Sequence, residues 1–372
     1  MRTSFPSLAA LGIALCLAAA PAPAQEVAPV GQAPTAETGR ALAVVRDAID
    51  GFIRPGYATL RKEADATASA MAALCQEPGA ETLEAAADRF GDLVRAWSRI
   101  ELVRFGPVVE DNRLERILFF PDRRGIALRQ VQAILGTEDE TATSAESLAE
   151  KSVAVQGLGA LEFVLFGTGA ETLAAGEGSF RCAYGLAVAQ NLAAMAASID
   201  AAWANENGIA ARLTAPAPTD PAYRGATDSL QEIVGIFVHG LEAVRDLRLA
   251  PALGESAEEA RPNLFLFRRS GSTLDSLQGN FEGLHDLFDA SRLADLLPAP
   301  QAYMETSIDF EFANAERTLA GLSEPLTDAV ASPQRQALTY LLIVTASLQD
   351  LFEAQLSPVL GLSSGFSSLD GD

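Results

Sequence analysis

The sequence predicts an all-α protein, and three observations lead to this fold class. Apolar residues recur at spacings of three and four, as in the stretch 88–104, where Phe90, Leu93 and Trp97 share one helical face. No stretch alternates strictly between apolar and polar residues, and strand-like clusters of β-branched residues are scarce. Of the 372 residues, 49% are hydrophobic, which is enough to build one large or two ordinary domains.

Eight segments carry this helical spacing and are expected to form helices. In chain order they are 41–52, 88–104, 148–166, 184–203, 230–247, 273–288, 303–322 and 336–356. The first is supported by Ala41, Val45, Ile49 and Phe52, and the fourth by Leu186, Leu192, Met195 and Ile199. The sixth also has a start signal, because Ser272 and Asp275 occupy the positions of a capping box.

A proline cluster divides the helices into two groups. The segment 215–221 reads APAPTDP, and proline disfavours helix. We therefore expect two four-helix-bundle-like domains, at 37–212 and 224–372, joined by a linker at 213–223. A weak internal repeat is consistent with a duplication, because Gln-Gly precedes Leu-Phe at the same spacing in 156–166 and 278–288.

The chain begins with the pattern of a cleavable signal peptide. Arg2 precedes the apolar run 8–20, and an A-x-A site ends at Ala24, so residues 1–24 are expected to be removed on export. A lipid anchor on Cys16 is not expected, because Leu15 stands where processing needs a small residue. A mobile Pro/Ala-rich lead at 25–36 follows. No later run of 18 apolar residues occurs, so no transmembrane segment is expected in the mature chain.

Two cysteines remain after the predicted cleavage, Cys75 and Cys182. An exported chain with an even number of thiols is expected to oxidise them, which predicts a disulfide across 107 positions. Two separate buried thiols are the alternative.

Charge excludes some functions. The chain has 27 basic and 49 acidic residues, a formal charge of −22, so it is not expected to bind nucleic acid. Its two histidines exclude a zinc site made of three imidazoles. The negative charge is consistent with binding of a cation or of a basic partner, and it also keeps a protein soluble.

Acidic residues inside apolar stretches are the first candidates for a site. Glu101 and Arg104 flank the stripe of Trp97, where they form either a site or a structural ion pair. Glu162 lies inside LGALEFVLF and requires a partner, which can be an arginine, a metal ion or a network of donors.

Two further motifs are weaker candidates for a functional site. Asp122 belongs to the loop FFPDRRG at 119–125, where it either faces a site or caps a helix. His239 and Glu242 form an H-x-x-E pair on one helical face, which makes them a weaker metal candidate and otherwise ordinary helix residues. We assign no role to His285.

Five motifs together resemble the imelysin-like family. They are WSRIELVRFGP (97–107), FFPDRRG (119–125), KSVAVQGLGALEFVLFG (151–167), RCAY (181–184) and the C-terminal GLSSGFSSLDGD. The resemblance implies two four-helix bundles related by duplication, a disulfide between the two cysteines, and export to the periplasm of a Gram-negative bacterium. It also implies a site near the domain junction around a GxHxxE motif. Relatives include a periplasmic component of ferrous-iron uptake, and the family is named for an insulin-cleaving protease.

This chain departs from the motif at its histidine. Gly157 and Glu162 match the family pattern, but Gly159 stands at the histidine position. A metallopeptidase needs about three side-chain ligands and a general base, so peptidase activity is not expected. Iron or another divalent or trivalent cation remains a candidate cofactor, because carboxylates alone can bind hard cations. Glu101, Asp122 and Glu162 are the candidates to converge on it.

These observations favour a non-enzymatic periplasmic protein that binds a ligand or metal as an accessory in iron acquisition, with envelope iron-uptake components as partners. A metallopeptidase that uses other ligands, such as His239 and Glu242, is the second hypothesis. The third is a purely structural or protein-interaction role, in which Glu101, Arg104 and Glu162 form a buried polar network.

Overall fold

Helices and turns make up the chain in a computed structural model that describes residues 35–363, and no strand occurs among them. The all-α prediction is confirmed. The predicted signal peptide, most of the lead and the last nine residues lie outside the described residues. From Ala36 onwards the chain groups as one compact unit.

The first predicted helix is much longer than its apolar stripe indicates. Helix α1 (Ala36–Ala48) continues through a π-helical turn, η1 (Ile49–Ile53), into α2 (Arg54–Gln76). Pro55 lies at the start of α2, where a missing N–H is tolerated. The sequence did not predict α2, because its buried positions include Glu63, Ala64 and Thr67 and so lack a continuous apolar stripe.

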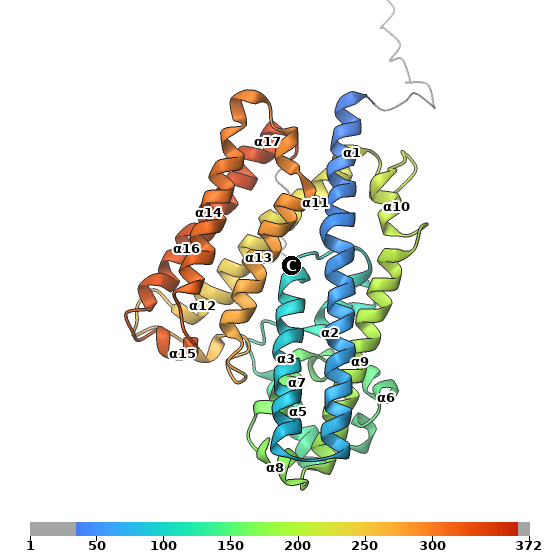
Figure 1. The fold of residues 1–372 in the computed structure, drawn as a ribbon, viewed down its shortest axis with the longest axis vertical. Helices are drawn as coiled ribbons and strands as arrows, with labels where there is room; N and C mark the ends of the chain where they lie inside the picture. The colour runs from blue at the N-terminus through green and yellow to red at the C-terminus, as the bar shows by residue number, and fades with distance from the viewer. Residues whose placement is uncertain (1–34, 364–372) are drawn as a thin grey trace, which may run out of the picture. The chain divides into compact units, whose positions relative to one another are not determined.

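Helices α2, α3 (Ala80–Ile100) and α9 (Ser179–Ala204) pack side by side, as Figure 1 shows. Cys75 at the end of α2 and Cys182 in α9 form a disulfide with their Cα atoms 5.6 Å apart. The predicted pairing is confirmed. It ties together two helices that are separated by 107 positions in the chain.

Short elements connect α3 to α9, and they provide most of the candidate site. In order they are η2 (Gly106–Val108), η3 (Glu110–Asn112), α4 (Arg113–Ile117), α5 (Ile126–Thr137), η4 (Glu140–Ala142), α6 (Ala145–Ala149), η5 (Val153–Val155), α7 (Leu158–Phe166) and α8 (Glu171–Ala175). The expectation of one continuous helix over 148–166 was wrong. Helix α7 starts only after Gly157, whose backbone lies against the carbonyls of Arg116 and Ile117.

The rest of the chain contributes the longer helices α11, α13, α14 and α16. The elements are α10 (Ile209–Thr214), α11 (Ala226–Ala243), η6 (Val244–Leu249), α12 (Ala250–Leu253), η7 (Pro262–Leu264), α13 (Thr273–Ser291), η8 (Leu293–Leu296), η9 (Ala299–Gln301), α14 (Tyr303–Ala320), α15 (Leu326–Ala329), α16 (Arg335–Asp350), η10 (Leu351–Leu356) and α17 (Ser357–Val359). Of the predicted linker 213–223, residues 213–214 still belong to α10 and the rest is non-helical. Helix α13 starts where the sequence predicts, but its N-terminal amide of Leu274 bonds to Glu324 rather than to Ser272.

The two predicted halves share a long contact. Helix α13 packs against α3, and α1 packs against both α11 and α13. Two glycines allow α13 to approach closely, because a Cβ at Gly283 would lie 2.2 Å from the carbonyl oxygen of Arg99 and one at Gly279 would crowd Ser98. The division into two duplicated domains stays a prediction.

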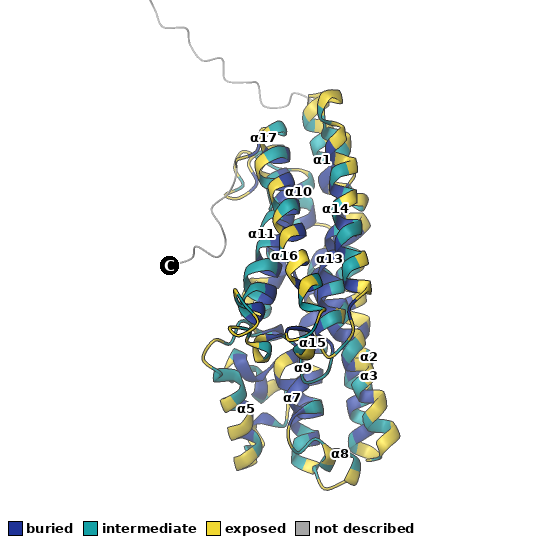
Figure 2. Ribbon diagram, turned by 90° about the vertical axis from the view of Figure 1, so that its left-hand side faces the viewer, coloured by how far each residue is buried: buried dark blue, intermediate teal, exposed yellow. Residues whose placement is uncertain are grey.

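Buried residues line the inner faces of the long helices, whereas their outer faces are exposed (Figure 2). Two helical stretches, Ser179–Thr214 and Arg335–Val359, are long and apolar enough to cross a membrane by composition alone. In the first, 67% of the most apolar window is buried within the fold, and in the second 39%. The absence of a transmembrane segment therefore stays a prediction.

Candidate functional site

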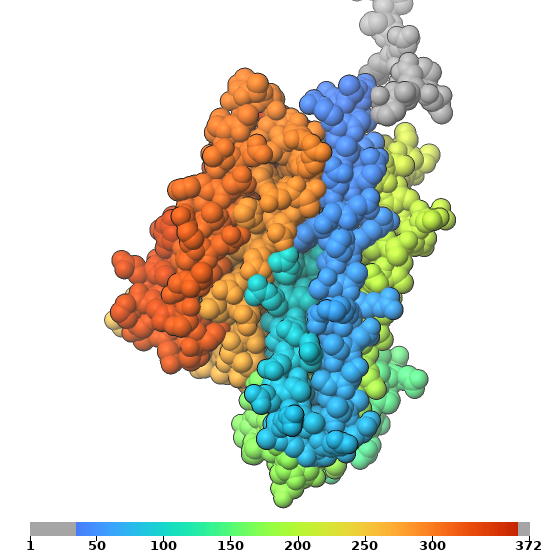
Figure 3. Space-filling model, viewed as in Figure 1, coloured from blue at the N-terminus to red at the C-terminus, as the bar shows by residue number. Residues whose placement is uncertain are grey.

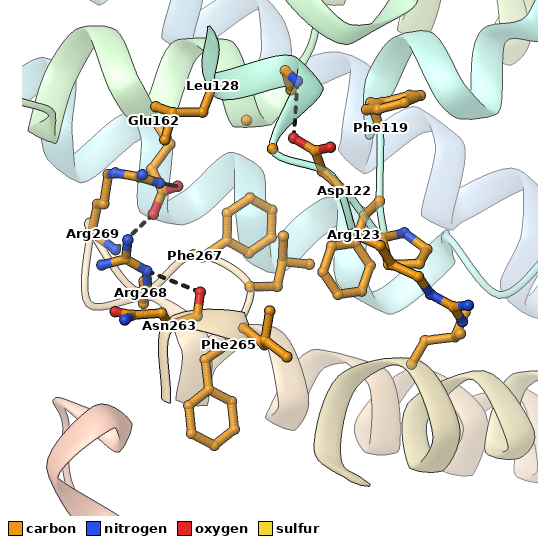
Figure 4. A pocket seen from close by; sticks show the side chains of 18 of the residues that line it. Phe119, Asp122, Arg123, Leu128, Glu162, Asn263, Phe265, Phe267, Arg268 and Arg269 are labelled. Atoms are coloured by element: carbon orange, nitrogen blue, oxygen red, sulfur yellow. Dashed lines mark hydrogen bonds and ion pairs between the residues drawn. The ribbon is translucent and has the colours of Figure 1, made fainter. Parts of the chain in front are cut away.

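A cavity of about 270 Å³ opens between three parts of the chain that the sequence keeps far apart. Its walls come from the loop 119–125 with the start of α5, from one face of α7, and from segments 246–251 and 263–269. Figure 4 shows Glu162 and Arg269 on one side and Asp122 and Arg123 on the other, with Phe267 between them. Most of the remaining wall is apolar and aromatic. It includes Phe119, Phe120, Leu128, Phe163, Leu264 and Phe265.

Glu162 lies in this wall with only 4% of its surface exposed. Its Oε1 accepts hydrogen bonds from the backbone N–H of Arg269 (2.9 Å) and Ser270 (3.1 Å) and from the Ser270 hydroxyl (3.2 Å). Its Oε2 lies 3.8 Å from Nη1 of Arg269. The partner that the sequence required is therefore a donor network with an arginine beside it.

Burial raises the pKa of the Glu162 carboxyl above its ordinary value. The backbone N–H of Ser270 and the charge of Arg269 oppose this rise but do not cancel it. The carboxyl is therefore held by fixed dipoles rather than by solvent, and it can gain a proton more easily than a surface glutamate.

A tight loop before α13 presents these donors. Phe267 has a left-handed backbone (φ 59°), and its carbonyl accepts hydrogen bonds from the Ser270 hydroxyl (2.9 Å) and the Ser272 N–H (3.1 Å). This turn directs the N–H groups of Arg269 and Ser270 toward α7. Sequence analysis did not find these residues, because they follow Glu162 by more than 100 positions and belong to no motif.

Asp122 lines the same cavity, but both of its oxygens are already used. Oδ1 accepts the N–H of Ile126 (2.7 Å) and Oδ2 accepts the N–H of Ala127 (2.9 Å), so the side chain caps α5. Of the two alternatives for Asp122, the helix cap describes its hydrogen bonds. The residue also faces the cavity (Figure 4).

The two glycines of the motif occupy different environments. A Cβ at Gly157 would lie 2.2 Å from the carbonyl oxygen of Ile117, so this glycine permits a close backbone approach. A Cβ at Gly159 would meet nothing within 4 Å, and Gly159 lines the cavity one turn before Glu162. The position where the family motif has histidine is therefore open space in this chain.

Glu101 does not line the cavity and belongs to a separate buried network. Nη2 of Arg248 lies 2.6 Å from both of its carboxylate oxygens, and Nδ2 of Asn280 donates to Oε1 at 2.7 Å. Arg104 was the expected compensating charge, but the partner is Arg248, which comes from η6. Within residues 35–363, Nε of Arg104 is buried without a hydrogen-bond partner.

The Arg248 network lies directly behind the aromatic wall of the cavity. Nη1 of Arg248 donates to the Ser276 hydroxyl at 2.7 Å, and the guanidinium lies 5.8 Å from the ring centre of Phe120. Phe120 lines the cavity, so this network supports one of its walls. Burial lowers the pKa of Arg248, and the charge of Glu101 opposes that effect.

The weaker metal candidates lie elsewhere on α11. His239 Nδ1 is 3.7 Å from Glu242 Oε2, and neither residue lines the cavity. Glu162 itself belongs to no group of three or more His, Cys, Asp or Glu side chains that could share an ion, as far as the described part of the chain shows. Of the predicted set, the structure brings together Glu162, Asp122 and Gly159, and it places Glu101, Arg104, His239 and Glu242 apart from them.

Comparisons with known proteins agree on the family and the fold. A family model described as Imelysin matches residues 53–355. Iron-regulated protein A of Synechococcus elongatus is 23% identical over 325 residues, which is 84% of this chain and 85% of that protein. The solved structure of an imelysin-like protein from Psychrobacter arcticum aligns with a TM-score of 0.74 and 20% identity, over 90% of this chain and 99% of that one. A candidate iron-regulated protein A precursor from Parabacteroides distasonis aligns with a TM-score of 0.72 and 12% identity, over 88% and 97% of the two chains.

Proposed function

Because this chain belongs to the imelysin family, we propose that it is an exported, non-enzymatic protein that binds a small organic ligand in the Glu162 cavity as an accessory in iron acquisition. The observation that carries this proposal is the open space at Gly159 beside a carboxyl whose hydrogen bonds are made within the protein. The wall of the cavity is mainly apolar and aromatic, as in sites that bind small organic molecules.

The charged groups around the cavity favour a ligand that carries a carboxylate. Both oxygens of Asp122 and Oε1 of Glu162 already accept hydrogen bonds. Among residues 35–363, Arg268 donates a hydrogen bond from Nε to the carbonyl of Asn263 at 3.2 Å and none from its two terminal nitrogens, which can therefore bind an anion. We therefore expect an aromatic or apolar body between the rings and an acid group at Arg268.

The link to iron comes from the relatives. Iron-regulated protein A carries iron in its name, and aromatic hydroxy acids are carboxylate ligands of Fe³⁺. The signal-peptide pattern at 1–24 supports the proposed export. An envelope protein that holds an iron-chelating acid, free or with its metal, fits these observations together.

The test is calorimetric titration with salicylate and with its Fe³⁺ complex. The wild type is expected to bind one equivalent with a Kd below about 100 μM. Arg268→Gln should weaken binding at least about tenfold, which is the loss of one charge-assisted contact. Arg261→Gln is the matched control, because Arg261 is an exposed arginine seven positions earlier that does not line the cavity. Equal affinity in both variants would remove the proposed role of Arg268.

Peptidase activity is tested separately with casein and insulin, with and without a chelator. We expect no chelator-sensitive cleavage, because the cavity holds one buried carboxyl and no imidazole. Chelator-sensitive cleavage that disappears in Glu162→Ala would instead support the metallopeptidase hypothesis. Tight binding of Fe³⁺ alone that depends on Glu162 would support a bare metal site.

A further inference from the structure

A second polar cluster lies between α13 and α14, away from the Glu162 cavity. His285, Asp289 and Asp309 each offer one ligand atom, and these three atoms all lie within 4.8 Å of one another. His285 and Asp289 are four residues apart, so they share one face of α13. Asp309 faces them from α14. Two helices therefore bring one nitrogen and two oxygen ligands together.

The imidazole of His285 is fixed in one orientation. Its Nδ1 lies 2.8 Å from Oε1 of Glu316, and its ring stacks on Phe312 with centroids 4.9 Å apart. Its Nε2 points to the other side, 3.8 Å from Oδ1 of Asp309. A histidine whose one nitrogen donates to a carboxylate presents the lone pair of the other, which is the usual arrangement of a metal-binding histidine.

One carboxylate oxygen of Asp309 is buried, although the side chain as a whole is half-exposed. Among the described residues, no hydrogen-bond partner contacts its buried Oδ1 atom. Asp289 and Asp309 bring two carboxylate oxygens to the same place, and a cation between them would remove the repulsion of their charges.

An ion can reach the cluster from solvent. Asp289 also lines an open cavity of about 530 Å³ between α13 and the turn from α1 into α2. Figure 3 shows these elements side by side on the visible face of the molecule. The side chains of His285 and Asp309 are 23% and 47% exposed, so the cluster lies at the surface and leaves room for water ligands.

We propose that His285, Asp289 and Asp309 bind a divalent first-row transition-metal ion, with Glu316 holding the imidazole in place. One imidazole and two carboxylates suit Zn²⁺, Fe²⁺ or Mn²⁺. Ligand bonds of about 2.1 Å place two atoms on one ion about 3.0 to 4.2 Å apart, as their angle at the ion widens from about 90° to about 180°. The 3.8 Å between Nε2 and Asp309 lies in this range. The proposal does not depend on the function of the Glu162 cavity.

The test uses Zn²⁺ alone on the chelator-treated, purified chain. The sequence has two histidines, so the imidazole ¹⁵N signals can be assigned with His239→Gln. We expect one equivalent of Zn²⁺ to bind with a Kd below about 10 μM. The Nε2 signal of His285 should shift on binding while that of His239 stays in place.

Asp309→Asn should weaken Zn²⁺ binding at least about tenfold. Asp286→Asn is the matched control, because Asp286 is an exposed acid on the same helix that pairs with Arg99 instead. Its affinity should stay within about threefold of the wild type. Circular dichroism checks that both variants fold. The proposal is overturned if neither histidine shifts at 1 mM (about 4 kcal/mol of binding), if His239 shifts instead, or if Asp309→Asn binds Zn²⁺ as the wild type does.

Discussion

At the scale of single residues, the environment of each side chain decides what it can do more than its identity does. Glu101 and Glu162 are both buried carboxylates, with 2% and 4% of their surface exposed. Glu101 is neutralised by Arg248, so it serves the packing of helices. Glu162 is held by backbone N–H groups and lines a cavity. Only the second carboxyl can contact a ligand.

Replacing each of the two motif glycines with alanine is predicted to change the stability of the fold in opposite directions. Gly157→Ala should destabilise the fold by more than about 2 kcal/mol, because its Cβ would collide with a backbone carbonyl. Gly159→Ala should stabilise it by about 0.5–1 kcal/mol, because alanine favours helix and meets only open space. Urea unfolding of the two variants measures both, and a loss of stability at Gly159 would refute the account of that position.

The raised pKa of Glu162 predicts a pH dependence. An acid whose folded pKa lies above its unfolded pKa binds protons more strongly in the folded state. Its contribution to stability is therefore greatest at low pH and falls as the pH rises from the unfolded pKa through the folded one. The difference in unfolding free energy between wild type and Glu162→Gln should shift against the wild type across this range. A constant difference from pH 4 to 8 would contradict the buried, raised carboxyl.

At the scale of elements, the Glu101–Arg248 pair joins the C-terminal end of α3 to η6, and Asn280 connects α13 to the same pair. The charges come from positions 147 residues apart, so they were not visible as a pair in the sequence. Spacing can suggest only a partner one turn away, and Arg104 was that suggestion. A long-range partner needs the fold.

Arg248→Met should cost about 3–5 kcal/mol, because it leaves the buried charge of Glu101 uncompensated. Adding Glu101→Gln should recover a large part of that loss, since the double variant no longer buries a lone charge. Chemical unfolding of the two single variants and the double variant gives the coupling energy. Additive losses would show that the two side chains do not depend on each other.

Across the whole molecule, the sequence predicts what depends on local periodicity. The apolar stripes predict α3, α9, α13 and α14, and the count of exported cysteines predicts the disulfide. Helix α2 was not predicted because it buries small and polar residues in place of a stripe. Part of the candidate site was predicted, namely Glu162, Asp122 and Gly159. The donors at 269–270 and the aromatic wall at 263–267 were not, because only tertiary packing brings them to α7.

The central claim is that the open space at Gly159 is where a ligand binds. Calorimetric titration of Gly159→Leu with salicylate tests it most directly, because a Cβ at this position meets nothing within 4 Å and the leucine side chain would extend into the cavity. We predict that the variant is at least as stable as the wild type and binds salicylate at least about tenfold more weakly. Unchanged salicylate affinity in a stable Gly159→Leu would contradict the claim.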